Sequence, residues 1–444
     1  MKVLVQKFGG TSVATPELRR QVVRRIMDAR RAGYAVAAVV SAMGRAGDPY
    51  ATDTLLGLLD GGTEPDPRDR DLLLACGEII ACVVLAHGLR ACGCPAVALT
   101  GRDAGIITDG NFGNARILRV DAEGVWRHLR DGRVAVVAGF QGVTADGQVT
   151  TLGRGGSDTT AAALGVALRA EAVEIFKDVE GVYTADPRLV PEAVPLERLS
   201  YREVVEMAHL GAKVVHPRAV EIAMEGRVPL RIRPTVGDGP GTLVCDGLGE
   251  GLGRGGDRVV TGVAHVPGRV QFRIPGAVGS SGPDQGPGRD DGMAGGRGGA
   301  GGAGQGDPED TVRNVFAQLG AAGVSADMIH VSPELVAFIV DEGSRRRAEK
   351  VLRSLAVPFA VTAGLAKVSV VGAGMHGVPG VMARVLKALH RARAPVLQTA
   401  DSHANISCLV REPDAARALR ALHEEFQLGA TGAHRQEAKA HEAG

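Results

Sequence analysis

The chain has few aromatic residues and no surplus of either charge, and both deficits exclude classes of partner. Aromatic residues make up 3% of the 444 residues, which disfavours the stacking platforms of single-strand nucleic-acid binders. The 51 basic and 50 acidic side chains give a net charge of +1, whereas nucleic acids and acidic membranes attract clearly basic surfaces. We therefore predict no nucleic-acid partner and no membrane partner.

Long apolar runs and paired cysteines are also missing. No uninterrupted apolar run reaches the roughly 18 residues of a membrane helix, and the first residues lack the apolar core of a signal peptide. The six cysteines, at 76, 82, 92, 94, 245 and 408, form no Cys-x-x-Cys pair, so a zinc knuckle is not expected. These absences predict a cytoplasmic protein with reduced, buried cysteines.

Residues 1–235 alternate between apolar runs of strand length and stretches with helical spacing. The runs at 2–6, 35–40, 133–138 and 172–176 are typical of buried strands. Helical spacing marks 72–89 and 159–168, and Thr15-Pro16 has the cap and first-turn proline of a helix start. This alternation predicts an α/β fold whose mostly parallel sheet carries helices on both faces.

Glycine is abundant, with 63 residues, and it concentrates in particular segments. Residues 236–258, which include Gly239-Pro240-Gly241, have the composition of a linker. Residues 276–308 almost lack large apolar side chains, so they cannot bury enough surface to offset the entropy lost on ordering. We predict a disordered insertion at 276–308 and a flexible tail at 431–444.

An internal repeat with an offset of 70 residues follows this insertion. Val315 and Leu319 correspond to Val385 and Leu389, and VAFIV at 336–340 corresponds to ISCLV at 406–410. Each copy reads as a helix followed by two strands, with an earlier strand at 259–263 or 367–371. Units of this size cannot bury both faces alone, so we expect them to pack on each other or on a second chain.

The first motif with chemical content is Lys7-Phe8-Gly9-Gly10-Thr11-Ser12, at the end of the first predicted strand. Two glycines let a backbone approach a phosphate, the N-terminus of the next helix attracts anions, and the lysine adds a positive charge. The spacing differs from that of a P-loop. A phosphate site explains the motif, and a tight turn beside a surface lysine is the alternative.

The second motif is Gly153-Arg154-Gly155-Gly156-Ser157-Asp158-Thr159-Thr160, again between a strand and a helix. Arg154 is suited to hold a carboxylate in a bidentate manner. Asp158 could position Lys7 or a metal-bound phosphate. Helix capping by Ser157 or Asp158 is the simpler alternative, but it does not account for three glycines and an arginine.

The third motif covers 176–188 and follows a predicted buried strand. It therefore lies at the carboxyl edge of the sheet, where open α/β sheets bind ligands. Its charged and turn-forming residues indicate a nucleotide contact, and an ordinary exposed loop is the alternative.

Together, these motifs resemble the aspartate kinase branch of the amino acid kinase family. The resemblance rests on KFGGTS at 7–12, VVSAM at 39–43, GRGGSD at 153–158, DVEGVYTADPR at 178–188 and AKVVHPRA at 212–219. It covers nearly the whole chain. It implies a three-layer αβα kinase domain at 1–235, a linker at 236–258, and two ferredoxin-like βαββαβ ACT domains, at 259–345 and 362–430.

The resemblance also implies a role for each motif residue, with ATP and L-aspartate as substrates and 4-phospho-L-aspartate as product. Lys7 would stabilise the transferring phosphoryl group and Asp158 would orient Lys7. Glu78 would bind the amino group of aspartate and Arg154 its α-carboxylate. The substrate-binding set is Thr52, Glu78, Arg154, Gly155, Gly156 and Ser157. The nucleotide-binding set is Lys7, Phe8, Gly9, Gly10, Ser41, Lys177, Asp178, Tyr183, Asp186, Arg188 and Lys213.

Two further implications concern position 177 and the metal. Many relatives have threonine where this chain has Lys177, which leaves the role of this lysine open. Mg²⁺ would bind mainly through the nucleotide phosphates, so no metal site built from protein side chains is expected.

For the C-terminal half, the resemblance implies feedback inhibition by an end product of the aspartate pathway: lysine, threonine or diaminopimelate. The effector would bind near Asp327, Met328 and Gln398. A homodimer through the ACT domains is also implied.

Alternatives remain open at this point. The spacing Gly372-x-Gly374-x-x-Gly377 is that of a dinucleotide-binding loop, but too few elements follow it for such a fold. The chain could phosphorylate another acidic amino acid, or act as a non-catalytic amino-acid sensor. His216 could be catalytic, although the start of a helix at Pro217 explains it more simply.

Overall fold

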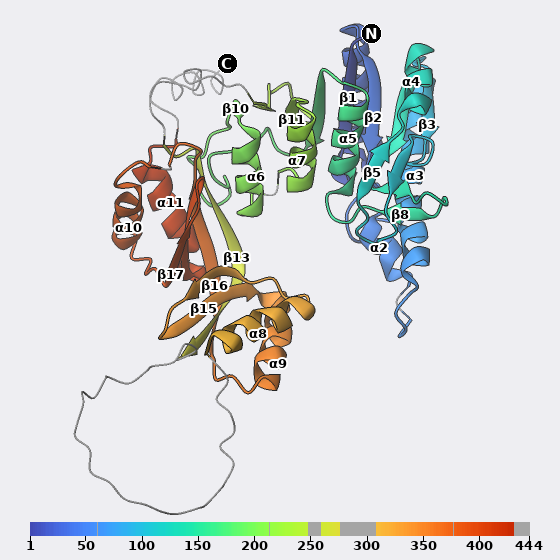
Figure 1. The fold of residues 1–444 in the computed structure, drawn as a ribbon. Coiled ribbons are helices and arrows are strands. Elements are labelled where there is room, and N and C mark those ends of the chain that lie inside the picture. Colours follow the sequence, from blue (N-terminus) through green and yellow to red (C-terminus); the bar gives the residue numbers. More distant parts are fainter. Residues whose placement is uncertain (60, 213, 247–258, 276–307, 376, 430–444) are drawn as a thin grey trace, which may run out of the picture. The chain divides into compact units, whose positions relative to one another are not determined.

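A computed structural model describes residues 1–59, 61–212, 214–246, 259–275, 308–375 and 377–429 (Figure 1). The chain forms two compact units: Met1–Ala264 with Val371–Val378 and Phe426–Gly444, and His265–Val370 with Pro379–Glu425. The predictions of a disordered insertion at 276–308 and of a flexible tail at 431–444 fall outside the described residues, except that Pro308 is described.

The first unit contains most of the secondary structure. Its elements are β1 (Val3–Phe8), η1 (Gly10–Val13), α1 (Pro16–Arg31), β2 (Ala35–Val40), α2 (Thr52–Gly57), α3 (Pro67–Ala91), β3 (Ala96–Leu99), β4 (Ile106–Thr108), β5 (Ile117–Val120), α4 (Glu123–Arg130), β6 (Val134–Ala138), β7 (Gln141–Val143), β8 (Val149–Thr151), α5 (Gly156–Ala167), β9 (Ala172–Lys177), β10 (Arg198–Leu199), α6 (Tyr201–His209), α7 (Pro217–Glu225), β11 (Leu230–Pro234) and β12 (Thr242–Val244).

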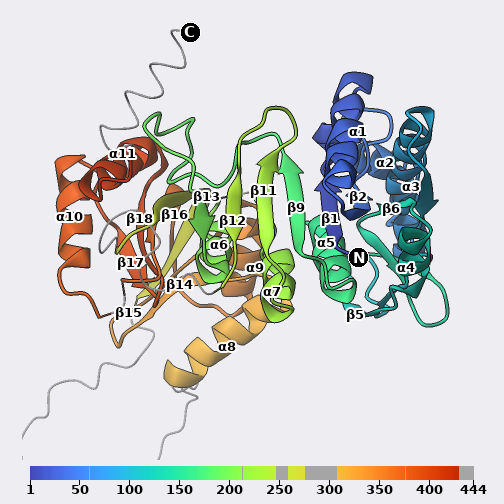
Figure 2. The same ribbon diagram turned by 90° about the horizontal axis from the view of Figure 1, so that it is seen from above.

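The main sheet of this unit has the strand order β10-β12-β11-β9-β1-β2-β6-β3. Strand β1 lies in its middle and pairs in parallel with β2 and β9, while β11 and β12 pair antiparallel. Helices α1 and α3 cover one face, and α4, α5 and α7 cover the other (Figure 2). A second sheet has the order β5-β4-β7-β8. The predicted αβα architecture with a mostly parallel sheet is confirmed.

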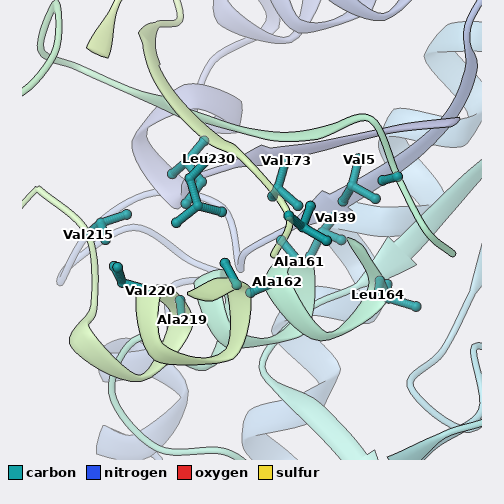
Figure 3. Close-up of a cluster of buried hydrophobic side chains, with 14 of the residues drawn as sticks. Val5, Val39, Ala161, Ala162, Leu164, Val173, Val215, Ala219, Val220 and Leu230 are labelled. Atoms are coloured by element: carbon teal, nitrogen blue, oxygen red, sulfur yellow. The ribbon is translucent and has the colours of Figure 1, made fainter. Parts of the chain in front are cut away.

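Alternation along the strands produces a core on each face of the sheet. Val3 and Val5 of β1 lie in the core beneath α5, whereas Leu4 and Phe8 lie in the core beneath α1 and α3. Figure 3 shows part of the first core, in which strand valines face the small residues of α5. Each fully buried valine or leucine stabilises the fold by about 1.5–3 kcal/mol relative to an exposed one.

Helix α3 is, among the described residues, the one helix long and apolar enough to cross a membrane by length and composition. Glu78 and His87 interrupt its apolar sequence, so it contains no uninterrupted apolar run of 18 residues. Half of its most apolar window is buried inside the fold, and Leu85 and Leu89 lie in the core. The helix also carries two buried carboxylates, Asp71 and Glu78. It is therefore a core helix of this unit.

Two details of the prediction for this region were wrong. The predicted linker contains β12, which pairs with β11 and β10 and so extends the main sheet. A strand of three residues is too short to be recognised by periodicity. All six cysteines are free as predicted, but Cys76 and Cys92 are exposed, not buried.

The second unit is built around one six-stranded sheet with the order β14-β15-β13-β16-β18-β17. Its elements are β13 (Gly262–Pro275), α8 (Pro308–Ala321), β14 (Asp327–Val331), β15 (Leu335–Asp341), η2 (Glu342–Ser344), α9 (Arg345–Ser354), β16 (Ala360–Val371), α10 (Val381–Arg391), β17 (Gln398–Asp401), β18 (Asn405–Arg411), η3 (Glu412–Asp414) and α11 (Ala415–Glu425).

The two long strands at the centre of this sheet, β13 and β16, have 14 and 12 residues. On one side of them lie β15 and β14, and on the other lie β18 and β17, so each copy of the repeat is a helix-strand-strand-helix set beside the same two strands. The strand predicted at 259–263 was misplaced, because β13 begins at Gly262 and continues to Pro275. Each copy also has a second helix, α9 or α11, that the 70-residue repeat did not reveal.

Candidate active site

The predicted phosphate loop lies at the carboxyl ends of three neighbouring strands. Lys7 is near the end of β1, Ser41 directly follows β2, and Lys177 is the last residue of β9. The backbone N–H of Ser41 donates to the carbonyl of Phe8 at 3.1 Å, so the β1 and β2 ends are tied together. In open α/β sheets the chain reverses its winding direction at such a central strand, and ligands bind there.

Lys7 forms a buried ion pair with Asp158. Its Nζ lies 2.7 Å from Oδ1, and the two side chains are only 6% and 5% exposed. Asp158 belongs to the first turn of α5, where the positive end of the helix dipole favours a carboxylate. Burial lowers the pKa of Lys7 to about 8, although the Asp158 carboxylate opposes this change. Burial alone would raise the pKa of Asp158, but the two neighbouring lysines hold it below its usual range.

Lys177 shares the same carboxylate. Its Nζ donates to Asp158 Oδ2 at 3.2 Å, and its side chain is 21% exposed. One buried carboxylate therefore holds two ammonium groups, one from β1 and one from β9. A threonine at this position could not form the second ion pair.

Gly10 fits the loop after β1 for a steric reason. A Cβ at Gly10 would come within 2.5 Å of the Ala42 carbonyl oxygen and 2.8 Å of the Gly44 carbonyl oxygen. The Gly44 N–H donates to the Gly10 carbonyl at 3.0 Å, so the backbones of the two loops are in direct contact. This approach is possible only for a residue without a side chain.

Glu78 lies in α3 and is almost fully buried. Its Oε1 accepts the backbone N–H of Ala42 at 3.0 Å, while Oε2 is buried without a hydrogen-bond partner among the described residues. Burial raises the pKa of Glu78 to about 8, although the Ala42 N–H and the charge of Lys7 oppose this change. The charge of Lys7 thus acts on this carboxyl, and the unpaired oxygen is an acceptor for a cationic group.

The loop of the second motif requires two glycines in the left-handed region, Gly153 at φ 73° and Gly155 at φ 70°. A Cβ at Gly155 would come within 2.2 Å of the His216 ring, so this ring packs directly on the loop. His216 precedes α7 as expected, but its side chain does not cap the helix. Arg154 is exposed at the N-terminus of α5, four residues before Asp158, where its guanidinium is available to a ligand.

The remaining predicted residues differ in their surroundings. Phe8 is fully buried and stacks on Phe176 at 4.8 Å between ring centroids, so a contact with nucleotide could involve only its backbone. Gly156 and Ser157 are also buried, whereas Gly9, Ser41 and Thr52 are partly exposed, with Thr52 as the first residue of α2.

The predicted nucleotide contacts of the third motif pair with other charged or polar side chains. Asp178 is paired with Arg45 at 2.9 Å, Tyr183 donates to Glu180 at 3.3 Å, and the exposed Arg188 pairs with Asp186. Lys213 lies outside the described residues.

Sequence reasoning missed one supporting residue, Asp71, which is fully buried at the start of α3. Its carboxylate accepts the N–H of Gly113 at 2.8 Å and both the N–H and the hydroxyl of Thr151, at 2.7 and 2.9 Å. Thr151 ends β8, two residues before the glycine-rich loop, so Asp71 fixes the position where this loop begins. No local signal marks a charged residue at the edge of an apolar helix as buried.

In the second unit, the three predicted effector residues are connected by contacts. Asp327 forms an ion pair with the buried Lys367, and Gln398 donates to the carbonyl of Met328. Gln398 also accepts from Gln271 at 2.8 Å. Burial opposes ionisation of Asp327, but Lys367 outweighs it and lowers the pKa of this carboxyl. These side chains link the edge strands β14 and β17 to the two central strands.

Comparison with known proteins agrees with this architecture. A profile of the amino acid kinase family matches residues 2–234, and a profile of the ACT domain matches residues 368–426. Aspartokinase 1 of Bacillus subtilis is 44% identical over 430 residues, which are 96% of this chain and 100% of that protein. An aspartokinase of Corynebacterium glutamicum is 38% identical over 443 residues, which are 97% of each chain.

Solved structures give the same result for the fold. The structure of Escherichia coli aspartokinase III in complex with aspartate and ADP has a TM-score of 0.72 at 24% identity, over 96% of this chain and 99% of that one. The complex of the same enzyme with lysine and aspartate has a TM-score of 0.71 at 24% identity, with the same coverage. The chain belongs to the amino acid kinase family, within its aspartokinase group.

Proposed function

We propose that this chain is an aspartate kinase that transfers the terminal phosphoryl group of ATP to the side-chain carboxylate of L-aspartate. The product is 4-phospho-L-aspartate, which begins the synthesis of lysine, threonine and methionine. The observation that carries this proposal is the buried Lys7–Asp158 pair, together with the buried, unpaired oxygen of Glu78, a carboxyl on which the charge of Lys7 acts. Similarity to aspartokinases along nearly the whole chain supports it.

The reaction needs charge compensation more than acid–base chemistry. The β-carboxylate of aspartate has an ordinary pKa of about 3.9, so the nucleophile is already ionised at neutral pH. The enzyme must instead bring two anions together and stabilise the charge on the transferring phosphoryl group. Lys7 supplies that charge, and Asp158 holds its ammonium group in place.

Two residues suit the ends of the aspartate molecule. Glu78 offers the buried acceptor Oε2 to the α-ammonium group, and an incoming cation lowers its raised pKa so that it binds as a carboxylate. Arg154 is exposed and can hold the α-carboxylate in a bidentate manner. Their opposite charges fix the direction in which aspartate lies.

The protein side chains near this centre are poorly suited to hold a metal ion themselves. Among the described residues, no group of three or more His, Cys, Asp or Glu side chains could do so. Both oxygens of Asp158 are occupied by lysines, and Asp178 is paired with Arg45. Mg²⁺ would therefore be held mainly by the ATP phosphates, where it would add positive charge.

We also propose that the second unit senses an amino acid: lysine, threonine or diaminopimelate. The effector would bind near Asp327, Met328 and Gln398, whose contacts connect both edges of the sheet. A homodimer formed through the ACT region and a cytoplasmic location complete the proposal.

An assay that couples ADP release to a colour change tests the proposal directly. Turnover should require aspartate, and glutamate or N-acetylglutamate should not replace it. Activity with glutamate alone would assign the chain to a different kinase. Titration of the aspartate reaction with each of the three effectors would identify the inhibitor, and the complete absence of turnover would favour the non-catalytic sensor.

Lys7→Ala separates catalysis from sensing. This variant should lose turnover, because it removes the buried ammonium group that would stabilise the charge on the transferring phosphoryl group. Effector binding measured by calorimetry should remain at the wild-type value. Full activity of Lys7→Ala would contradict the role given to Lys7.

A further inference from the structure

The centre described above has more positive than negative charge. Within the part of the chain that the structure describes, Lys7 and Lys177 bring two ammonium groups, and Asp158 brings the one carboxylate that contacts both. Glu78 does not offset the difference, because a carboxyl with a pKa of about 8 is mostly protonated at neutral pH. Buried charge is costly unless it is paired, so this arrangement favours an anionic ligand.

Lys177 is positioned to meet such a ligand. Its backbone carbonyl accepts the N–H of Thr235 at 2.8 Å and the hydroxyl of Thr235 at 3.1 Å. That hydroxyl also contacts the hydroxyl of Ser12 at 2.7 Å, which connects the end of β9 to the loop after β1. The Lys177 side chain is 21% exposed while that of Lys7 is 6% exposed, so Lys177 is the more accessible of the two ammonium groups.

An ammonium group has three N–H donors, and Asp158 uses one of those of Lys177. Asp158 is its single hydrogen-bond partner within the described residues. The other donors are thus available to phosphate oxygens at the carboxyl edge of the sheet. Lys7 is next to it on the adjacent strand, where the β1–β9 register pairs Lys7 with Ile175.

We propose that Lys177 is a second phosphate-binding residue, which Asp158 holds beside Lys7 so that two ammonium groups face the polyphosphate of ATP together. The proposal rests on the kinase function proposed above, and it gives this chain a phosphate contact that a threonine at position 177 cannot supply. The proposal predicts that this chain binds nucleotide phosphates more tightly than a variant with threonine at position 177. This prediction does not depend on which amino acid accepts the phosphoryl group.

Direct binding measurements test this without any turnover. Calorimetry would compare adenosine, AMP, ADP and an ATP analogue with an uncleavable β–γ bridge. The proteins would be the wild type, Lys177→Met, Lys177→Arg and Lys177→Thr. Lys2→Met is the matched control, because Lys2 is an exposed lysine on the same sheet, paired with Glu171.

Lys177→Met should weaken binding of ADP or of the ATP analogue by about tenfold to a hundredfold, the range for one charge-assisted hydrogen bond. Adenosine binding should not change, Lys177→Arg should recover most of the loss, and Lys2→Met should resemble the wild type. If Lys177→Met binds ADP and the ATP analogue as tightly as the wild type, the proposal is wrong, even if the variant is less stable. If Lys177→Met does not fold, Lys177→Thr, which also removes the ammonium group, gives the same comparison.

A pH profile separates a phosphate-binding role from a structural one. Among the described residues, the charged groups that act on Lys7 are Asp158 on α5, Lys177 on β9 and Glu78 on α3, and Asp158 in turn acts on His216 before α7. Because the charge of Lys177 lowers the pKa of Lys7, nucleotide affinity should begin to fall near pH 8 in the wild type and at higher pH in Lys177→Met. An unchanged profile would contradict this coupling.

The two proposals can fail separately. A wild-type protein that binds the ATP analogue but does not phosphorylate aspartate would refute the kinase assignment and leave the Lys177 test valid. A protein with normal aspartate turnover and no effect of Lys177→Met on phosphate binding would refute only the inference about Lys177.

Discussion

Asp71 accepts two hydrogen bonds from Thr151, one from its backbone N–H at 2.7 Å and one from its hydroxyl at 2.9 Å. The pair joins the N-terminal part of the core helix α3 to the last residue of β8, from which the glycine-rich loop departs. The loop carrying Arg154 thus starts from a fixed point even though Arg154 itself is exposed.

Asp71→Ala should lower the free energy of unfolding by about 2–4 kcal/mol, because it leaves the donors of Thr151 and Gly113 buried without acceptors. The KM for aspartate should rise as the loop loses its fixed start. Chemical denaturation and steady-state kinetics measure the two effects. Asp69→Ala, an exposed position on the same helix, is the control, and equal stability of both variants would contradict the account.

Glu78→Gln should have opposite effects on stability and on substrate binding. The pKa of Glu78 is about 8 in the folded protein and ordinarily 4.5, so between these values the folded state keeps a proton that the unfolded state has released. The stability of the wild type therefore falls as pH rises through this window, whereas glutamine has no charge to bury. We expect the variant to be more stable than the wild type by about 2 kcal/mol at pH 9 and by little at pH 5.

The same variant should bind aspartate poorly, because an amide lacks the negative charge that the α-ammonium group needs. Denaturation curves at pH 5, 7 and 9, together with the KM for aspartate, check both parts. Glu17→Gln, at a fully exposed site, provides the comparison. If the difference in stability between Glu78→Gln and the wild type is the same at pH 5, 7 and 9, Glu78 is not a buried, protonated carboxyl.

Arg154→Lys should raise the KM for aspartate by about tenfold while leaving the affinity for ADP close to that of the wild type. Lysine keeps the charge but loses the planar, bidentate hydrogen bonding of the guanidinium group. Steady-state kinetics and calorimetry with ADP give the two values. Arg24→Lys, at an exposed position of α1, should change neither. A loss of ADP affinity without a change in the KM for aspartate would show that Arg154 binds the nucleotide and not aspartate.

Gly10→Ala should reduce nucleotide binding at least tenfold and destabilise the first unit by about 2 kcal/mol. The added methyl group would overlap the carbonyl oxygens of Ala42 and Gly44, so the two loops would have to separate. Gly110→Ala is the control, since a Cβ there meets nothing within 4 Å. Calorimetry with ADP and thermal denaturation of both variants make the comparison, and equal behaviour would show that the loops are free to move apart.

Arg393→Gly should stabilise the second unit by about 0.5–1 kcal/mol. Arg393 has φ 51°, in the left-handed region, and its counterpart in the first repeat is Gly323 at φ 65°. A residue with a side chain costs about 1–2 kcal/mol in this conformation. Replacement by glycine removes that strain, but glycine loses more conformational entropy on folding, so the net gain is smaller. Thermal denaturation measures the gain, and Gly323→Arg should produce a loss of similar size. A destabilised Arg393→Gly would show that contacts of the arginine outweigh the backbone strain.

The sequence predicted the parts of this molecule that are determined locally. The KFGGTS and GRGGSD loops, the apolar strands around Val5 and Val39, and the repeat around Val315 and Val385 follow from glycine, charge and periodicity over a few residues. These patterns were enough for the αβα architecture and for the two loops that approach each other at Lys7 and Asp158.

Tertiary packing determined the rest. The burial of Asp71 depends on β8, which lies 80 positions along the chain, and the pairing of Lys177 with Asp158 depends on the β1–β9 register. Likewise, β12 is a strand only because β10 and β11 supply its hydrogen bonds. No window of neighbouring residues contains this information, so sequence patterns left these features open.

The two central strands of the C-terminal sheet, β13 and β16, belong to both halves of the repeat at once. A change in the structure of one half should therefore affect the other half, because both halves pack against these two central strands. A small molecule that orders one edge strand would therefore also affect the opposite edge through these two central strands, so that the two copies of the motif would respond together.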